Sequence, residues 1–125
     1  MNDAYMQAFA IDWIDAWNSH DLERILRHYS EDIAVTSPFV EMIVGPGQGT
    51  ISGKSALRNY WTAALTKYTD LKFDLFRAYP GVNSVVVHYR SVAGFLGMEF
   101  MRFDGHDLVC EVRAHYAPET NESMV

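Results

Sequence analysis

The sequence predicts an α+β fold, with helices in the first half of a single domain and a mainly antiparallel sheet in the second. Up to about residue 68, apolar residues recur at intervals of three and four, which is the spacing of amphipathic helices. From Asp70 onward the interval changes to two, which is the spacing of half-buried strands. Helices followed by a run of strands and turns are typical of α+β domains.

Three helices are expected in the first half. The first carries an apolar and aromatic stripe that recurs every three or four residues: Tyr5, Phe9, Trp13 and Trp17. A short second helix follows Asp21, whose carboxylate can cap it by accepting from unpaired backbone N–H groups. Its apolar face is Leu22, Ile25, Leu26 and Tyr29. The third helix begins after Gly53 and continues to about Tyr68.

Strands are predicted on both sides of the third helix. A first strand ends at Ser37-Pro38, because proline has no N–H to donate to a sheet ladder. Residues 39–52, which include several glycines, are expected to form a loop, either a flap over a pocket or a surface loop without a role. An antiparallel meander of strands near residues 71–75, 85–90, 98–103 and 108–116 completes the sheet, with a turn at Tyr79–Asn83.

Size and composition limit the possible functions. The chain has 125 residues, and we expect one domain over residues 1–117 with a flexible tail at 118–125. A net charge of −6 argues against a nucleic-acid partner, and no apolar run is long enough for a membrane span. Cys110 is the single cysteine, so no internal disulfide can form. Without the pattern of a signal peptide, we expect a cytoplasmic protein.

Several short motifs carry a family resemblance across nearly the whole chain. They are Ala16-Trp17-Asn18 with His20-Asp21, Ser37-Pro38, Gly53, the stretch 99–105 and the stretch 114–118. In this order they resemble the nuclear transport factor 2-like superfamily, in its SnoaL-like polyketide cyclase and ketosteroid isomerase branch. The resemblance implies three helices packed on a curved sheet, a cystatin-like roll, which forms a cone with a ligand cavity at its open end.

The same resemblance implies only part of a catalytic site. Ketosteroid isomerases place an aspartate base before the proline that ends the first strand, where this chain has Ser37. Their tyrosine donor on the first helix corresponds to Trp13, and their protonated acid corresponds to Glu99. One of the three positions therefore keeps its chemistry, and steroid isomerisation by that mechanism is not expected.

Glu99 is the first candidate catalytic residue. Alternation along its strand places it on the same face as Met101 and Phe103. If that face lines the cone, desolvation would raise its pKa and allow it to act as an acid or hydrogen-bond donor. The resemblance implies the same role, because ketosteroid isomerases are the established example of a carboxylic acid kept neutral in an apolar site. The alternative is an edge carboxylate that reaches solvent or pairs with an arginine.

His88 and Arg90 are the other two catalytic candidates. They share one face of their strand, while Val85, Val87 and Tyr89 share the other. We favour an inward orientation for His88 and Arg90, which would bring them to Glu99 as an acid–base cluster. In the outward orientation they would belong to a polar contact between two subunits. In either case a homodimer through the outer sheet face is expected.

The expected ligand is a small, largely apolar molecule with a carbonyl or hydroxyl group. The predicted pocket residues are mostly aromatic or apolar: Trp13, Trp17, Ser37, Phe39, Tyr60, Trp61, Met101, Val112 and Tyr116. No histidine or cysteine spacing suggests a metal site, and no cofactor is expected. Two functions remain open: a cofactor-free isomerase, cyclase or hydrolase with Glu99 as its acid, and a non-catalytic binding or association domain that lacks the base.

Overall fold

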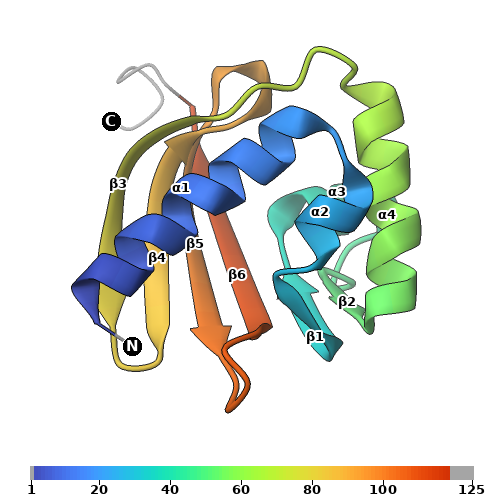
Figure 1. The fold of residues 1–125 in the computed structure, drawn as a ribbon. Helices are drawn as coiled ribbons and strands as arrows, with labels where there is room; N and C mark the ends of the chain where they lie inside the picture. The colour runs from blue at the N-terminus through green and yellow to red at the C-terminus, as the bar shows by residue number, and fades with distance from the viewer. Residues whose placement is uncertain (1, 119–125) are drawn as a thin grey trace.

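A computed structural model describes residues 2–118, which form helices and a single sheet (Figure 1). The helices are α1 (Asp3–Ser19), α2 (Leu22–Leu26), α3 (Pro38–Val44), α4 (Lys54–Lys67) and the short 3-10 helix η1 (Val92–Gly94). The strands are β1 (Tyr29–Thr36), β2 (Thr50–Ser52), β3 (Asp74–Gly81), β4 (Ser84–Arg90), β5 (Leu96–Phe103) and β6 (Val109–Ala117). The predicted tail lies outside the described residues, apart from Pro118.

The sheet is curved and mainly antiparallel, which confirms the predicted fold class. Its six strands follow the order β2-β1-β6-β5-β4-β3, so the predicted meander β3 to β6 forms most of it. The one parallel pair is β1 with β6, which joins the N-terminal strand to the C-terminal one. Figure 1 shows α1 lying across one face of the strands β3 to β5, with α4 beside β1 and β2. This arrangement leaves the space between the helices and the sheet for a core and a cavity.

The aromatic stripe of α1 supplies much of the core. Phe9, Trp13 and Trp17 are buried, while Tyr5 at the start of the helix is 39% exposed. Asn2 caps the start of the helix, because its side chain accepts a hydrogen bond from the Tyr5 N–H. His20 caps the other end and adopts a left-handed conformation with φ of 60°. The capped helix is thereby held with its aromatic face against the sheet.

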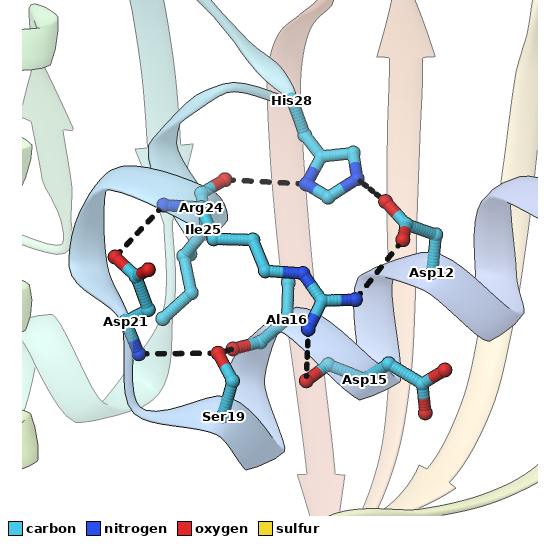
Figure 2. Close-up of polar contacts among 8 residues, drawn as sticks. All are labelled: Asp12, Asp15, Ala16, Ser19, Asp21, Arg24, Ile25 and His28. Carbon is cyan, nitrogen blue, oxygen red and sulfur yellow. Dashed lines mark hydrogen bonds and ion pairs between the residues drawn. The ribbon is translucent and has the colours of Figure 1, made fainter.

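A polar cluster fixes the turn between α1 and α2 (Figure 2). Asp12 contacts two side chains, with its carboxylate 3.2 Å from the Arg24 guanidinium and 2.7 Å from Nε2 of His28. Arg24 also donates to the backbone carbonyl of Asp15 at 3.5 Å. Asp21 caps α2 as predicted, because its carboxylate accepts from the backbone N–H of Arg24 at 3.3 Å.

Residues 39–52 differ from the predicted loop. Pro38–Val44 form α3 and Thr50–Ser52 form the edge strand β2, which pairs with β1. Ser37 explains the helix, since its hydroxyl accepts from the backbone N–H of Phe39 and Pro38 occupies the first helical turn. The short strand gives β1 an outer neighbour, and the helix lies at the rim of the cavity.

Two further boundaries differ from the prediction. Tyr29 does not continue α2 but begins β1, because the helix ends at Leu26. Strand β3 continues through Tyr79 and Pro80 to Gly81, so the turn into β4 is shorter than expected. Proline is tolerated there because β3 is the edge strand of the sheet. Among the described residues, no helix is both long and apolar enough to cross a membrane.

Candidate functional site

A cavity of about 390 Å³ lies between the helices and the sheet. Helices α1, α3 and α4 line one side, and strands β4, β5 and β6 line the other. Its volume falls within the range of small-molecule sites in proteins. The side chains along it are mostly aromatic or aliphatic, with Glu99 as the one acidic and Lys67 as the one basic lining residue among those described.

Aromatic side chains in mutual contact build the cavity wall. The rings of Trp17 and Trp61 meet edge to face, with centroids 4.9 Å apart, which joins α1 to α4. Trp13 meets Tyr89 in the same way at 5.1 Å, which joins α1 to β4. Phe39 of α3 lies 4.4 Å from Tyr116 of β6. Aromatic pairs of this kind add stabilisation beyond their buried area, so these contacts stabilise the wall and tie its helices to the sheet.

A carboxyl group lies in this wall between two tyrosines. Glu99 of β5 is 7% exposed, and its Oε1 accepts a hydrogen bond of 2.8 Å from the hydroxyl of Tyr89 on β4. The hydroxyls of Tyr89 and Tyr116 are 3.3 Å apart. Three adjacent strands thus each contribute one side chain to the same polar cluster, which we call the Tyr–Glu–Tyr cluster (Tyr89, Glu99 and Tyr116).

Gly97 makes the Tyr–Glu–Tyr cluster possible. It pairs across the sheet with Tyr89 on one side and with Tyr116 on the other. A Cβ atom at this position would lie 2.8 and 2.9 Å from atoms of the Tyr89 ring and 3.3 Å from the Tyr116 ring. A glycine is therefore required for the two rings to close over β5 at this position, which lies two residues before Glu99 on the same face.

The surroundings of Glu99 change its acidity. Burial raises its pKa from 4.5 to about 7, although the tyrosine hydroxyls of Tyr89 and Tyr116 lower it in part by stabilising the carboxylate. Burial, followed by the nearby Glu99 charge, raises the pKa of Tyr89 well above its usual value of 10, and the same causes raise the pKa of Tyr116. Near neutral pH, Glu99 is consequently divided between acid and carboxylate while both tyrosines keep their protons.

Two buried serines add hydroxyl groups to the wall. Ser37 is 7% exposed and caps α3 through its contact with the Phe39 N–H at 3.2 Å. Ser91 is 6% exposed and follows β4, where its side chain makes no capping hydrogen bond to η1.

Over residues 2–118, no group of three or more His, Cys, Asp or Glu side chains is placed to hold a metal ion.

Trp13 is engaged in a structural hydrogen bond behind the wall. Its indole N–H donates to the hydroxyl of the buried Tyr29 at 2.7 Å. Burial raises the pKa of the Tyr29 hydroxyl, and the indole N–H of Trp17 acts in the opposite direction. Among the described residues, this N–H has no partner in hydrogen-bond geometry. Trp13 occupies the position at which the resemblance expects a tyrosine donor, and its N–H is already bonded to Tyr29.

With this geometry established, comparison with known proteins identifies the family. The model of the SnoaL-like domain matches residues 10–121, which is most of the chain. The chain belongs to the SnoaL-like family.

Solved structures of other proteins resemble this chain over nearly its whole length. A SnoaL-like protein of unknown function from Burkholderia thailandensis is 40% identical, with a TM-score of 0.90, and the match covers 93% of this chain and 97% of that one. A protein of unknown function with a cystatin-like fold from Methylobium petroleophilum is 17% identical, with a TM-score of 0.72 and coverage of 98% and 82%.

An enzyme structure is also similar in fold. It is the epoxide hydrolase/cyclase-like enzyme SalBIII of pyran ring formation in the polyether salinomycin. The two chains are 14% identical, with a TM-score of 0.71 and coverage of 94% of this chain and 95% of that one. Comparison with curated proteins found no match.

In this SnoaL-like chain, the three catalytic candidates do not lie together: Glu99 lies on the inner face of the sheet, and His88 and Arg90 lie on the outer face. Glu99 shares the buried face of β5 with Met101 and Phe103 and lines the cavity. The inward orientation expected for His88 and Arg90 is wrong, because Tyr89 and its alternate neighbours occupy the inner face of β4. On the outer face, the ring of His88 lies 5.1 Å from that of Phe76, and the Arg90 guanidinium lies 5.5 Å from the same ring.

Seven of the nine predicted pocket residues line the cavity of this SnoaL-like chain: Trp13, Trp17, Ser37, Phe39, Tyr60, Trp61 and Tyr116. Met101 and Val112 do not, because each is at most 1% exposed and packs within the core. Both lie on the inner sheet face, but deeper than the cavity.

Tyr89 and Ser91 also line the cavity, although they are not among the residues predicted there. The signal that could have found them is the alternation on β4, which continues from Val87 through Tyr89 to Ser91 once the apolar set is assigned to the inner face. That assignment follows from burial, since a Val-Val-Tyr face gains more from the core than a His-Arg face.

Proposed function

We propose that this protein binds a small, largely apolar molecule in its cavity and that Glu99 acts on a carbonyl or hydroxyl oxygen of that molecule. The proposed activity is that of a cofactor-free isomerase, cyclase or hydrolase. One observation carries it: a carboxyl group with a pKa of about 7 lies in an aromatic cavity of about 390 Å³. Such a group costs stability, and perturbed groups of this kind cluster at functional sites.

The Tyr–Glu–Tyr cluster suits proton transfer near neutral pH. An acid with a pKa near the working pH is present in both forms, so it can give a proton and take it back. The tyrosine hydroxyls remain protonated, and they can stabilise negative charge that develops on a ligand oxygen beside Glu99. The pKa of Glu99 is set by burial and by these two hydroxyls, and no basic side chain contributes to it, so its proton is available to a ligand.

The family supports these reaction types without deciding between them. SalBIII is described as epoxide hydrolase/cyclase-like and acts in pyran ring formation. Opening an epoxide or closing an oxygen ring is assisted by an acid that protonates the departing oxygen. Glu99 supplies such an acid in this chain, and the wall around it is largely apolar.

A panel of hydrophobic ketones and epoxy alcohols tests the proposal with wild type and Glu99→Gln. Thermal shift measures binding, and product formation measures turnover. We expect wild type to convert at least one panel member, and Glu99→Gln to lose about a hundredfold or more in rate while it still binds. Absence of thermal shift with every member would contradict ligand binding in the cavity.

The second candidate is a ligand-binding protein without catalysis. Ser37 favours it, because a serine that caps α3 has no basicity to replace the expected aspartate. Trp13 favours it too, because its N–H is bonded to Tyr29. Binding by wild type without turnover of any bound panel member, together with similar affinity of Glu99→Gln, would select this function.

We also propose that the protein acts as a cytoplasmic homodimer joined through the outer face of the sheet. The single cysteine supports a reducing compartment. The outer face supports the dimer, because it carries Phe76 and Met98, which are 46% and 40% exposed, beside His88 and Arg90.

A further inference from the structure

Ser91 is a buried polar residue without a structural role in the described protein. Residues Val85, Val87 and Tyr89 alternate on the inner face of β4, and Ser91 continues this alternation just past the strand end. Its side chain lines the cavity and does not cap η1. Within residues 2–118 its hydroxyl has no hydrogen-bond partner, and it is not among the polar atoms sealed inside the core. Its open side is therefore the cavity.

The other buried serines differ from Ser91 in this respect. The hydroxyl of Ser37 accepts from the Phe39 N–H, and that of Ser30 donates to Asp32 at 2.7 Å. Buried hydroxyl groups are normally hydrogen-bonded, because leaving one unpaired forfeits its interaction with water. The Ser91 hydroxyl instead opens to the cavity, so a ligand oxygen that enters the cavity can become its hydrogen-bond partner.

We propose that Ser91 is a second ligand-recognition residue and that the ligand carries two oxygen functions on an apolar frame. This inference rests on the proposed function, in which the first oxygen meets the Tyr–Glu–Tyr cluster. Tyr89 and Ser91 are two residues apart on one face, which corresponds to about 7 Å along a strand. We therefore expect the second oxygen of the ligand to lie about 7 Å from the first. The ligand class is a rigid diol, hydroxyketone or diketone.

The experiment compares two aromatic probes of nearly equal size by isothermal titration calorimetry. 2-Naphthol offers one oxygen, and 2,6-dihydroxynaphthalene offers a second at the far end of the same frame. The proteins are wild type, Ser91→Ala and the control Ser84→Ala. Ser84 begins the same strand but does not line the cavity.

We expect wild type and Ser84→Ala to bind the diol about fivefold more tightly than 2-naphthol, which is the effect of one neutral hydrogen bond. Ser91→Ala should lose that preference and keep its affinity for 2-naphthol within about twofold. Equal affinity of wild type for both probes, or an unchanged diol preference in Ser91→Ala, would overturn the role of Ser91 while cavity binding stands. Failure of both probes to bind wild type would overturn cavity binding and the role of Ser91 together.

Discussion

Glu99 determines the charge of the cavity through a single proton. It is the one acidic side chain among the described cavity-lining residues, and it is surrounded by aromatic rings and two tyrosine hydroxyls. When it is protonated, the inner end of the cavity is neutral and can donate a hydrogen bond. When it is ionised, the same place becomes an acceptor that the tyrosines stabilise. A change of pH across the neutral range therefore changes what kind of ligand oxygen the site can meet.

The first prediction concerns the stability of Glu99→Gln across pH. The pKa of Glu99 is about 7 in the folded protein and 4.5 in the unfolded chain, so the folded protein keeps the proton to a higher pH. The contribution of Glu99 to the free energy of unfolding is thus present below pH 4.5 and falls by roughly 3 kcal/mol as the pH rises to 7. Urea unfolding of both proteins between about pH 4 and pH 8 measures this.

Glutamine keeps the size of the side chain and does not titrate. All other ionisable groups are the same in both proteins, so the difference in stability between wild type and Glu99→Gln reports the titration of Glu99 alone. Its stability relative to wild type should increase from pH 4.5 to about 7 and then stay constant. A difference that does not change with pH would mean that Glu99 has an ordinary pKa in the folded protein.

At the scale of the strands, three neighbours position the site by their register. Strands β4, β5 and β6 set Tyr89 and Tyr116 on either side of Gly97, two residues from Glu99 on the same face. The site is therefore fixed by sheet hydrogen bonds and not by loops. Residues held by a sheet ladder keep their mutual distances well, which suits a site that depends on hydrogen bonds of about 3 Å.

The second prediction is that Gly97→Ala destabilises the protein by about 1–3 kcal/mol. The added methyl group would meet the Tyr89 ring at 2.8 Å, and that ring is 1% exposed and enclosed by the core. Urea unfolding measures the loss. Gly105→Ala is the matched control, because no atom lies within 4 Å of a Cβ added there. Equal stability of the two variants would show that the tyrosine rings move aside without cost.

The third prediction concerns the polar cluster between α1 and α2. Burial pushes the pKa of Asp12 upward, but hydrogen bonds from His28 and Arg24 outweigh it and lower the pKa below 3.8. The Asp12 carboxylate is 56% exposed, so Asp12→Asn should cost less than about 1 kcal/mol of unfolding free energy. This stabilisation exists above pH 3.8 and disappears as the pH falls through the lowered pKa.

Asp15→Asn is the control for that substitution. Arg24 contacts the backbone carbonyl of Asp15, and Figure 2 shows the Asp15 carboxylate without a dashed contact. Thermal unfolding near neutral pH should leave Asp15→Asn at the wild-type midpoint and lower that of Asp12→Asn. Similar midpoints for both variants would mean that the ion pairs contribute nothing measurable.

The elements that sequence could predict are those with a strong period or a strong cap. The stripe of α1 and the Asp21 cap of α2 are of this kind, and both are confirmed. Helix α3 was missed because Val40, Ile43 and Val44 have low helix propensity, although Ser37-Pro38 is also a helix start. The predicted orientation of His88 was wrong because a buried subunit contact and a buried core both favour an apolar face, and alternation alone does not distinguish the two.

For the whole molecule, the sheet has a covered side and an open side. The helices lie over the inner side, while the outer side of β4 and β5 shows His88, Met98 and their neighbours. The fold class was predictable from the order of elements, and the family, with its cone and cavity, from the short motifs that resemble it. The depth of each residue within the cone was not predictable, because alternation along a strand shows only which residues share a face. Met101 and Val112 were accordingly predicted in the cavity and lie in the core.

The fourth prediction is that sedimentation velocity at micromolar concentration finds a dimer. Met98 lies in the middle of the proposed contact, paired with His88 on one side and His115 on the other. A positive charge there would be buried between two histidines, which carry no negative charge to pair with it, so Met98→Lys should convert the dimer to monomer. Val82→Lys is the control, because Val82 is 91% exposed in the β3–β4 turn. A monomeric wild type would contradict the proposed dimer.

The arrangement of the tryptophans has a practical consequence. The chain has three, and all of them, Trp13, Trp17 and Trp61, line the cavity. The tryptophan fluorescence of the protein therefore originates entirely from the wall of the candidate site. A molecule that enters the cavity alters the environment of every such emitter at once, without a background from distant indoles. Unknown ligands can therefore be sought in mixtures by measuring tryptophan fluorescence, without a label on the protein or on the ligand.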